Sequence, residues 1–220
     1  MTEATGTRLS GQARGIHLSS AGRAQAPALS ERLAPVPLAA VYASPLERCV
    51  ETARAVARPR ELAVRVLPAL TEVAYGSWTG RPLAQLARTA LWKDVQRSPS
   101  QARFPGGESL AEVQRRAVAA LDRLVAEHPR RAIAAVSHAD VIRLALAHYA
   151  GIHLDLFQRL VVGTTSVSAV VLGDVPRIVR MNDSGTLEDL VPKRPQRGPS
   201  RERGAAAHAR TSRRSTPPPR

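Results

Sequence analysis

The 220-residue sequence contains a single cysteine, Cys49. One cysteine leaves no intramolecular disulfide and no cysteine-based metal cluster, which favours a reducing compartment. The sequence has no stretch of about 18 apolar residues, and its first residues lack the apolar segment that is typical of a signal peptide. These absences predict a soluble, cytoplasmic protein with no membrane partner.

Aromatic residues are also scarce, at 3% of the chain. Hydrophobic residues make up 44%, so the core has to rest on leucine, valine, isoleucine and alanine. A chain of this length can bury one sizeable core within a single α/β domain. We find no internal repeat and no pattern of a second core, so one folded domain is expected.

Negative charge is nearly absent from the C-terminal segment. Residues 193–220 contain nine Lys or Arg and one acidic residue, Glu202, which gives this segment a net charge of +8. The net charge of the chain is +14, so residues 1–192 carry the other +6. The segment has no aromatic residue and no apolar period, which predicts a disordered basic tail behind a folded domain at 1–192. Without stacking aromatics we expect no specific nucleic-acid recognition, and an electrostatic tether to an anionic surface is the alternative.

Helical and extended patterns alternate before this tail. Helices are expected at 18–34, 45–57, 106–129 and 139–150, and strands at 39–44, 62–70, 132–137, 166–172 and 177–181. Ser109 and Glu112 form a capping-box pattern in the third helix, whereas Pro27 is expected to kink or shorten the first. This alternation predicts an α/β fold, a three-layer α/β/α sandwich with a mostly parallel central sheet.

Three polar side chains follow three different predicted strands. His138 stands where a strand passes into a helix, Arg48 lies in the first helical turn after SPLE, and Glu72 follows the extended segment that ends near residue 70. Ligands of such folds bind at the carboxyl ends of the strands, beside helix N-termini that attract anions. A histidine, an arginine and a carboxylate at these places predict an anion pocket that contains an acid.

Five segments carry a family pattern when they are taken in order. They read LSSAGRAQAPALSERL, SPLERCVETA, EVAYGSWTG, FPGGESLAEVQRRAVAAL and VSHADVIR. Together they resemble the histidine phosphatase superfamily, the phosphoglycerate mutase-like enzymes, over residues 2–183. No single segment is decisive, but five in the same order are strong support for the phosphatase branch of this superfamily.

The resemblance implies a mechanism and a set of catalytic residues. In this superfamily a histidine attacks phosphorus to form a phosphohistidine, which water then hydrolyses, with no metal and no cofactor. Arg48 and His138 match the residues that bind the phosphoryl oxygens, and Glu72 matches the proton donor to the leaving oxygen. The expected substrate is a small phosphorylated metabolite.

Three further residues are expected to contact the substrate. Thr5 stands where the superfamily has an asparagine in its first loop, and His17 lies in a loop that should border the pocket. Ala139 replaces the glycine that usually follows the histidine of the VSH motif, so a methyl group is expected to narrow the pocket there.

The nucleophile is missing from the chain. The superfamily carries it in a first strand ending in Arg-His-Gly, and Met1 falls immediately after the position of that glycine. No other histidine of the chain replaces it in this interpretation. We therefore expect that Met1 is a misassigned start and that the natural protein has one more strand, flanked by the strands near residues 41 and 133.

Two alternative functions stay open. A phosphoglycerate mutase would use the same chemistry, but mutases carry a longer insertion after the glutamate, and the short segment 81–104 favours hydrolysis. A non-catalytic phosphate-binding relative, or pseudophosphatase, is the interpretation that applies if the chain begins at Met1.

Overall fold

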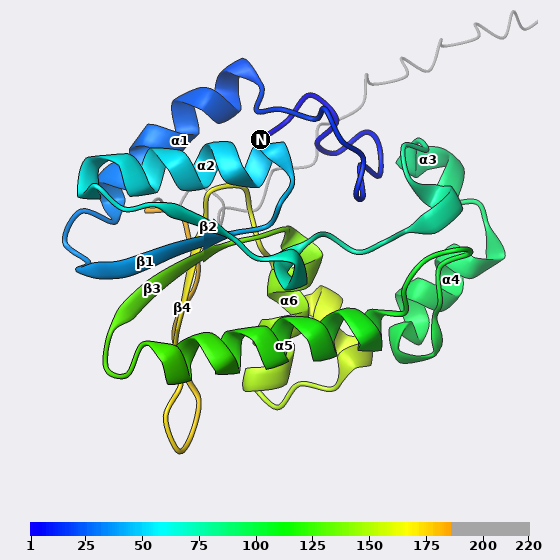
Figure 1. Cartoon of the computed structure of the whole chain (residues 1–220). Helices are drawn as coiled ribbons and strands as arrows, with labels where there is room; N and C mark the ends of the chain where they lie inside the picture. The colour runs from blue at the N-terminus through cyan, green and yellow to red at the C-terminus, as the bar shows by residue number, and fades with distance from the viewer. Residues whose placement is uncertain (186–220) are drawn as a thin grey trace, which may run out of the picture. The chain divides into compact units, whose positions relative to one another are not determined.

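The computed structural model describes residues 1–185, and the predicted tail at 193–220 lies outside the described residues (Figure 1). The strands are β1 (Leu38–Ala43), β2 (Val64–Val66), β3 (Ala132–Val136), β4 (Val167–Val171) and β5 (Arg177–Asp183). The α-helices are α1 (Ser20–Arg32), α2 (Glu47–Ala57), α3 (Leu83–Leu86), α4 (Ala90–Arg97), α5 (Leu110–Glu127) and α6 (Ala139–Tyr149). Short 3₁₀ helices are η1 (Arg58–Arg60), η2 (Pro68–Leu70), η3 (Gly76–Trp78), η4 (Pro99–Gln101) and η5 (Leu154–Arg159). No helix within residues 1–185 combines the length and the hydropathy that crossing a membrane requires.

The central sheet has the strand order β2-β1-β3, and both pairings are parallel. Val41 of β1 lies opposite Val64 on one side and Ala134 on the other. Helices α1 and α2 cover one face of this sheet, whereas α5 and α6 lie on the other (Figure 1). The predicted fold class, a three-layer α/β/α sandwich with a parallel sheet, is therefore confirmed.

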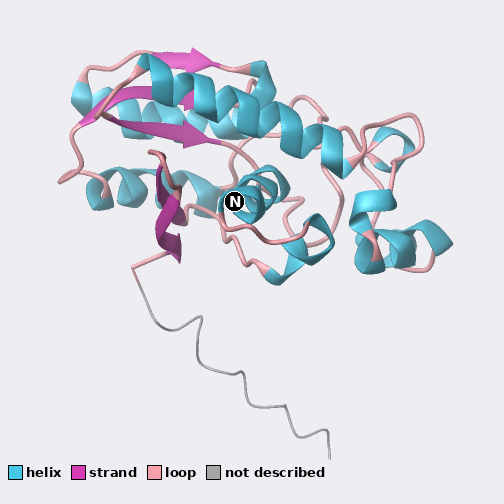
Figure 2. Ribbon diagram, turned by 90° about the horizontal axis from the view of Figure 1, so that it is seen from below, coloured by secondary structure: helices cyan, strands magenta, loops and turns pink. Residues whose placement is uncertain are grey.

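Strands β4 and β5 form a separate antiparallel hairpin, and Figure 2 shows this pair apart from the three-stranded sheet. The prediction that a further strand would lie between the strands near residues 41 and 133 is wrong, because β1 and β3 pair directly with each other. Within residues 1–185, the edges left without a strand partner include one side of β3 and one side of β4. Ala134 and Val136 of β3 pack against the same buried cluster as Val167 of β4.

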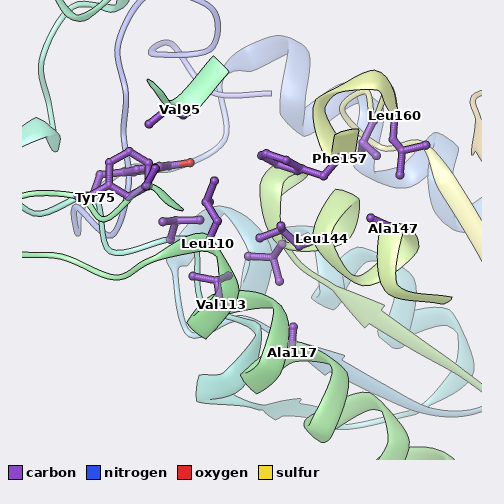
Figure 3. Close-up of a cluster of buried hydrophobic side chains, with 14 of the residues drawn as sticks. Tyr75, Val95, Leu110, Val113, Ala117, Leu144, Ala147, Phe157 and Leu160 are labelled. Carbon is purple, nitrogen blue, oxygen red and sulfur yellow. The ribbon is translucent and has the colours of Figure 1, made fainter. Parts of the chain in front are cut away.

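Buried side chains form three clusters around these layers. One lies between β1 and the helices α1 and α2, and includes Val41, Ala53 and Val56. A second lies between the sheet and α5, and includes Tyr42 of β1 and Leu124 of α5. The largest joins α5 and α6 to the region of α3 and α4, and Figure 3 shows part of it.

Local sequence signals explain most helix ends. Ser109 accepts a hydrogen bond from the backbone N–H of Glu112 (3.3 Å), and Glu112 accepts one from the N–H of Ser109 (2.9 Å), so the predicted capping box is confirmed. Ser19 caps α1 by accepting from the N–H of Gly22 at 3.1 Å. Pro27 lies inside α1, which nevertheless continues to Arg32. Helices α3 and α4 were not predicted, because four and eight residues are too short for a clear period.

Candidate active site

The carboxyl ends of the three parallel strands carry the polar side chains of the site. Ser44 follows β1, and its N–H donates to the carbonyl of Val136 (2.9 Å). This hydrogen bond extends the pairing of β1 and β3 towards His138, the N-cap residue of α6. Ser137 donates its hydroxyl to the carbonyl of Leu70 (2.7 Å), which ties the loop before Glu72 to the same edge. The strand ends therefore bring the predicted residues together, as expected for a parallel sheet.

His138 is the buried centre of this site, with 5% of its side chain exposed. Its Nε2 lies 2.8 Å from the hydroxyl of Ser44, and its Nδ1 lies 3.3 Å from Nη2 of Arg48. Cys49 on α2 places its sulfur 3.5 Å from Nε2. Burial first, and then the charges of Arg48 and Arg116, lower the pKa of His138 to about 3, so the imidazole is neutral.

Arg48 reaches the site from the first turn of α2. Its Nη2 donates to the carbonyl of Gly11 at 2.7 Å, which fixes the guanidinium against the N-terminal loop. Its Nη1 is buried and has no hydrogen-bond partner among residues 1–185. A buried guanidinium N–H that is left without an acceptor is costly, and an anion in the pocket would satisfy it.

Glu72 supplies the carboxyl group, and 15% of its side chain is exposed. Its Oε1 accepts from the N–H of Val73 (2.9 Å), and its Oε2 lies 3.9 Å from Nδ1 of His138. Burial, followed by the nearby charge of Asp140, raises the pKa of Glu72 to about 8. A carboxyl group that holds its proton near neutral pH is suited to act as a general acid.

The backbone of Glu72 is held by two side chains from other segments. Its carbonyl accepts from Nε2 of Gln12 (2.7 Å) and from Nη2 of Arg116 on α5 (3.2 Å). Arg116 also donates to the carbonyl of Ala69 (2.7 Å) and pairs with Glu108 (2.8 Å). Gln12 and Arg116 therefore both hold the backbone of the loop that carries Glu72.

Gly76 allows the loop that follows Glu72 to pack closely against Pro105, in the segment before α5. Its φ is +53°, and a Cβ there would lie 2.0 Å from the carbonyl oxygen of Pro105. The N–H of Ala74 donates to Oε2 of Glu108 (2.9 Å), while the N–H of Glu108 donates back to the carbonyl of Ala74 (2.9 Å). Only glycine fits this close approach, and it explains the Gly in the sequence AYGSW.

The three residues expected at the substrate lie farther from the pocket or at its edge. Thr5 is exposed and bonds to Thr2 within the N-terminal turn. His17 is 60% exposed and pairs with Glu51 of α2. Ala139 is the first residue of α6, next to His138, and is half-buried against the largest cluster. A role in substrate contact stays a prediction for all three.

Several residues of the site were not predicted as such. Ser44 and Cys49 were not among the predicted site residues, yet both contact the imidazole of His138. The hydroxyl of Tyr75 donates to Oδ2 of Asp140 at 2.6 Å, beside the carboxyl of Glu72. Their positions depend on contacts between distant segments, which no local pattern reveals.

Cys49 is not poised as a nucleophile. Its side chain is buried, and burial raises the pKa of the thiol to about 12, so the thiolate is not populated at neutral pH. Within residues 1–185, no group of three or more His, Cys, Asp or Glu side chains is arranged to hold a metal ion.

The fold is that of an established class of phosphoryl-transfer proteins. The pattern of the histidine phosphatase superfamily (branch 1) matches residues 1–184, and the chain belongs to this superfamily. The family resemblance noted in the sequence is therefore confirmed.

Individual relatives are phosphatases. Phosphoserine phosphatase 1 of Hydrogenobacter thermophilus is 30% identical over 156 residues, which cover 70% of this chain and 74% of the relative. Mycobacterial glucosyl-3-phosphoglycerate phosphatase has a TM-score of 0.76 and 26% identity, covering 84% of this chain and 95% of its own. The α-ribazole phosphatase of Shigella flexneri has a TM-score of 0.74 and 26% identity, covering 83% and 92%. A histidine phosphatase function with the superfamily's phosphohistidine chemistry is thus supported at the level of the family.

Proposed function

We propose that this protein hydrolyses small phosphomonoesters, with Arg48 and His138 binding the phosphoryl group and Glu72 protonating the leaving oxygen. The observation that carries the proposal is the convergence of these three side chains from three strand ends. The unpartnered Nη1 of Arg48 supplies a donor for a phosphoryl oxygen, and a guanidinium suits such oxygens in geometry and charge.

Glu72 fits the proton-transfer role because its raised pKa keeps the proton available near neutral pH. In the proposed reaction a histidine nitrogen attacks phosphorus, the bond from phosphorus to the alcohol oxygen breaks, and that oxygen takes the proton of Glu72. The resulting carboxylate then accepts a proton from the water that attacks the phosphohistidine, which returns free histidine and releases phosphate.

In this proposal the attacking histidine is carried by an added strand. We infer that such a strand would pair between β3 and β4, since within residues 1–185 each of these strands has an edge without a partner. The carbonyl of Met1 accepts from the N–H of Ser19 (3.1 Å), and its amino group donates to Oε1 of Gln25 on α1 (3.4 Å). A segment preceding Met1 would therefore start beside the N-terminal half of α1.

The test compares the 220-residue chain with an extended chain that carries an N-terminal strand ending in Arg-His-Gly. We expect the extended chain to hydrolyse p-nitrophenyl phosphate in the presence of EDTA. Arg48→Ala and His138→Ala should each lower kcat/KM by about 100-fold or more, which is typical for loss of one preorganised donor. His153→Ala is the matched control, because His153 is 69% exposed and lies far from these contacts in sequence. Full activity in either pocket variant would remove that residue from the site.

The extended chain should also be the more stable one. A strand between β3 and β4 would pair backbone groups on both edges, and each buried group left unpaired costs about 1 to 3 kcal/mol. We therefore expect a higher urea midpoint and less binding of an apolar dye in the extended chain. Equal midpoints would argue against a strand at this position.

Phosphate binding without hydrolysis is the second candidate, and it is favoured by the lack of a second histidine in the pocket within residues 1–185. In that case the 220-residue chain would unfold cooperatively and bind inorganic phosphate through Arg48, and the added strand would confer no turnover. The phosphoglycerate mutase alternative is disfavoured because only the short helices η3, α3, α4 and η4 lie between Glu72 and α5.

A further inference from the structure

Two of the buried polar side chains of this protein face each other at the strand ends. Within residues 1–185 the buried polar residues are Ser19, Ser30, Ser44 and His138, and Ser44 is the most completely buried of them, at 0% exposure. Its hydroxyl lies 2.8 Å from Nε2 of His138. Buried polar groups are costly unless they are hydrogen-bonded, so this contact stabilises both side chains.

The sequence Ser-Pro after β1 holds the hydroxyl of Ser44 in place. The hydroxyl oxygen accepts from the backbone N–H of Leu46 at 3.4 Å, and Pro45 between them restricts the backbone of this turn. The backbone N–H of Ser44 donates to the carbonyl of Val136 on β3. Both the backbone and the side chain of Ser44 are therefore fixed by contacts that do not involve the imidazole of His138.

Arg48 determines which nitrogen of this imidazole carries the proton. One N–H of its Nη2 donates to the carbonyl of Gly11 at 2.7 Å, which leaves the other for Nδ1 of His138 at 3.3 Å. A guanidinium can only donate, so Nδ1 accepts, and a neutral imidazole that accepts at Nδ1 carries its proton on Nε2. The Nε2–H group of His138 therefore donates to the hydroxyl oxygen of Ser44.

This arrangement turns Nδ1 of the imidazole towards the pocket. The sulfur of Cys49 lies 3.5 Å from Nε2, and its thiol donates to the carbonyl of Ser137, so protein atoms close the Nε2 side of the ring. On the other side, Nδ1 lies beside Arg48 and 3.9 Å from Oε2 of Glu72. A phosphoryl oxygen bound by Arg48 would meet Nδ1, which has to be protonated to donate to it. The imidazolium carries protons on both nitrogens, so Nε2–H keeps its hydrogen bond to Ser44 in that state.

We propose that Ser44 is a positioning residue of this site: its hydroxyl oxygen accepts Nε2–H of His138 and so directs Nδ1 towards the phosphoryl group. The inference rests on the proposed function, because it specifies how His138 is presented to the phosphoryl group. Without this hydroxyl, Nε2–H would be a buried donor with no oxygen acceptor. The ring would then lose its fixed orientation, and the phosphoryl oxygen would lose a preorganised donor.

Nuclear magnetic resonance with isotope-labelled histidine reports which nitrogen of His138 is protonated, in the 220-residue chain and in the extended chain in parallel. Near neutral pH we expect a signal with the proton on Nε2 that is absent from His138→Ala. In Ser44→Ala this proton should exchange with water at least about tenfold faster, and the dissociation constant of inorganic phosphate, measured by calorimetry, should rise about tenfold. Ser30→Ala, which removes another buried hydroxyl on α1, should leave both quantities unchanged.

A neutral His138 that carries its proton on Nδ1 in the wild type would overturn the inference, and this result needs no variant that has to fold. An unchanged phosphate affinity in Ser44→Ala would overturn the positioning role, even if the proton exchanges faster. The same loss of affinity in Ser30→Ala would overturn it as well, because any buried hydroxyl would then have this effect. If inorganic phosphate does not bind to the wild type, or binds equally well to Arg48→Ala, the proposed function fails and the inference fails with it, whichever nitrogen carries the proton.

Discussion

Replacing Glu72 with glutamine tests the buried acid on which proton donation depends. Burial and the charge of Asp140 raise the pKa of Glu72 from its ordinary 4.5 to about 8. In this pH interval the folded protein keeps a proton that the unfolded chain releases. The contribution of Glu72 to the free energy of unfolding is therefore at its maximum below about pH 4.5 and decreases as the pH rises towards 8.

The magnitude follows from the difference between the two pKa values. Each pKa unit is worth about 1.4 kcal/mol, so a change from 4.5 to about 8 corresponds to up to about 5 kcal/mol. The free energy of unfolding of a domain is only about 5 to 15 kcal/mol, so the amount lost at alkaline pH is a large fraction of the total stability. Glutamine does not titrate, so the free energy of unfolding of Glu72→Gln should not decrease over this pH range.

His138 has the opposite dependence and sets the pH range of the assay. Its pKa falls from 6.5 to about 3 in the folded state, so the stability linked to it is lost as the pH falls from 6.5 towards 3. Well above pH 6.5 the imidazole is neutral in both states, and the carboxyl of Glu72 dominates the pH dependence up to about pH 8.

Urea unfolding of the extended chain between about pH 6.5 and pH 8.5 provides the measurement. We expect the free energy of unfolding to fall with pH in the wild type and to stay nearly level in Glu72→Gln. Glu31→Gln, which changes an exposed carboxylate on α1, should follow the wild type. If wild type and Glu72→Gln show the same pH dependence, the assignment of Glu72 as a buried, protonated acid is refuted.

Three substitutions test the contacts that hold the site, with urea midpoints as the measurement. Arg116→Ala should cost about 3 kcal/mol, because it removes the ion-pair partner of Glu108 and the N–H donor to the carbonyl of Ala69, and a cost below about 1 kcal/mol would contradict this. Ser109→Ala should cost about 1 kcal/mol by removing the capping box of α5, and no change would show that the cap is dispensable. Gly76→Ala should cost more than about 2 kcal/mol, since its Cβ would meet the carbonyl of Pro105, and wild-type stability would mean that the two loops can separate.

Most elements could be predicted from local patterns in the sequence. The capping-box pattern of Ser109 and Glu112 helped to predict α5 to within a few residues of its observed ends. The short apolar runs around Val41 and Ile133 predicted β1 and β3. Their direct pairing was missed because a strand contains no signal of its neighbour in the sheet, and strand order depends on contacts across some ninety residues of chain, as the partners Val41 and Ala134 show.

The three predicted catalytic residues lie together because each of them follows the end of a strand. Arg48, His138 and Glu72 are brought together by the parallel sheet itself, which the alternating pattern predicts. Ser44 and Cys49 could not be assigned in this way, because a serine before a proline and a cysteine within a helix have several common structural roles. Only the position of the imidazole shows that both line the same pocket.

The pocket is held by contacts that do not involve the open edges of β3 and β4. Arg48 is fixed by the carbonyl of Gly11, the imidazole of His138 by Ser44, and the carboxyl of Glu72 by the N–H of Val73. None of these three hydrogen bonds involves a strand between β3 and β4. In the proposed function, binding and turnover are therefore separable: phosphate binding depends on the strand-end loops, and hydrolysis depends on whether a histidine reaches the pocket beside His138.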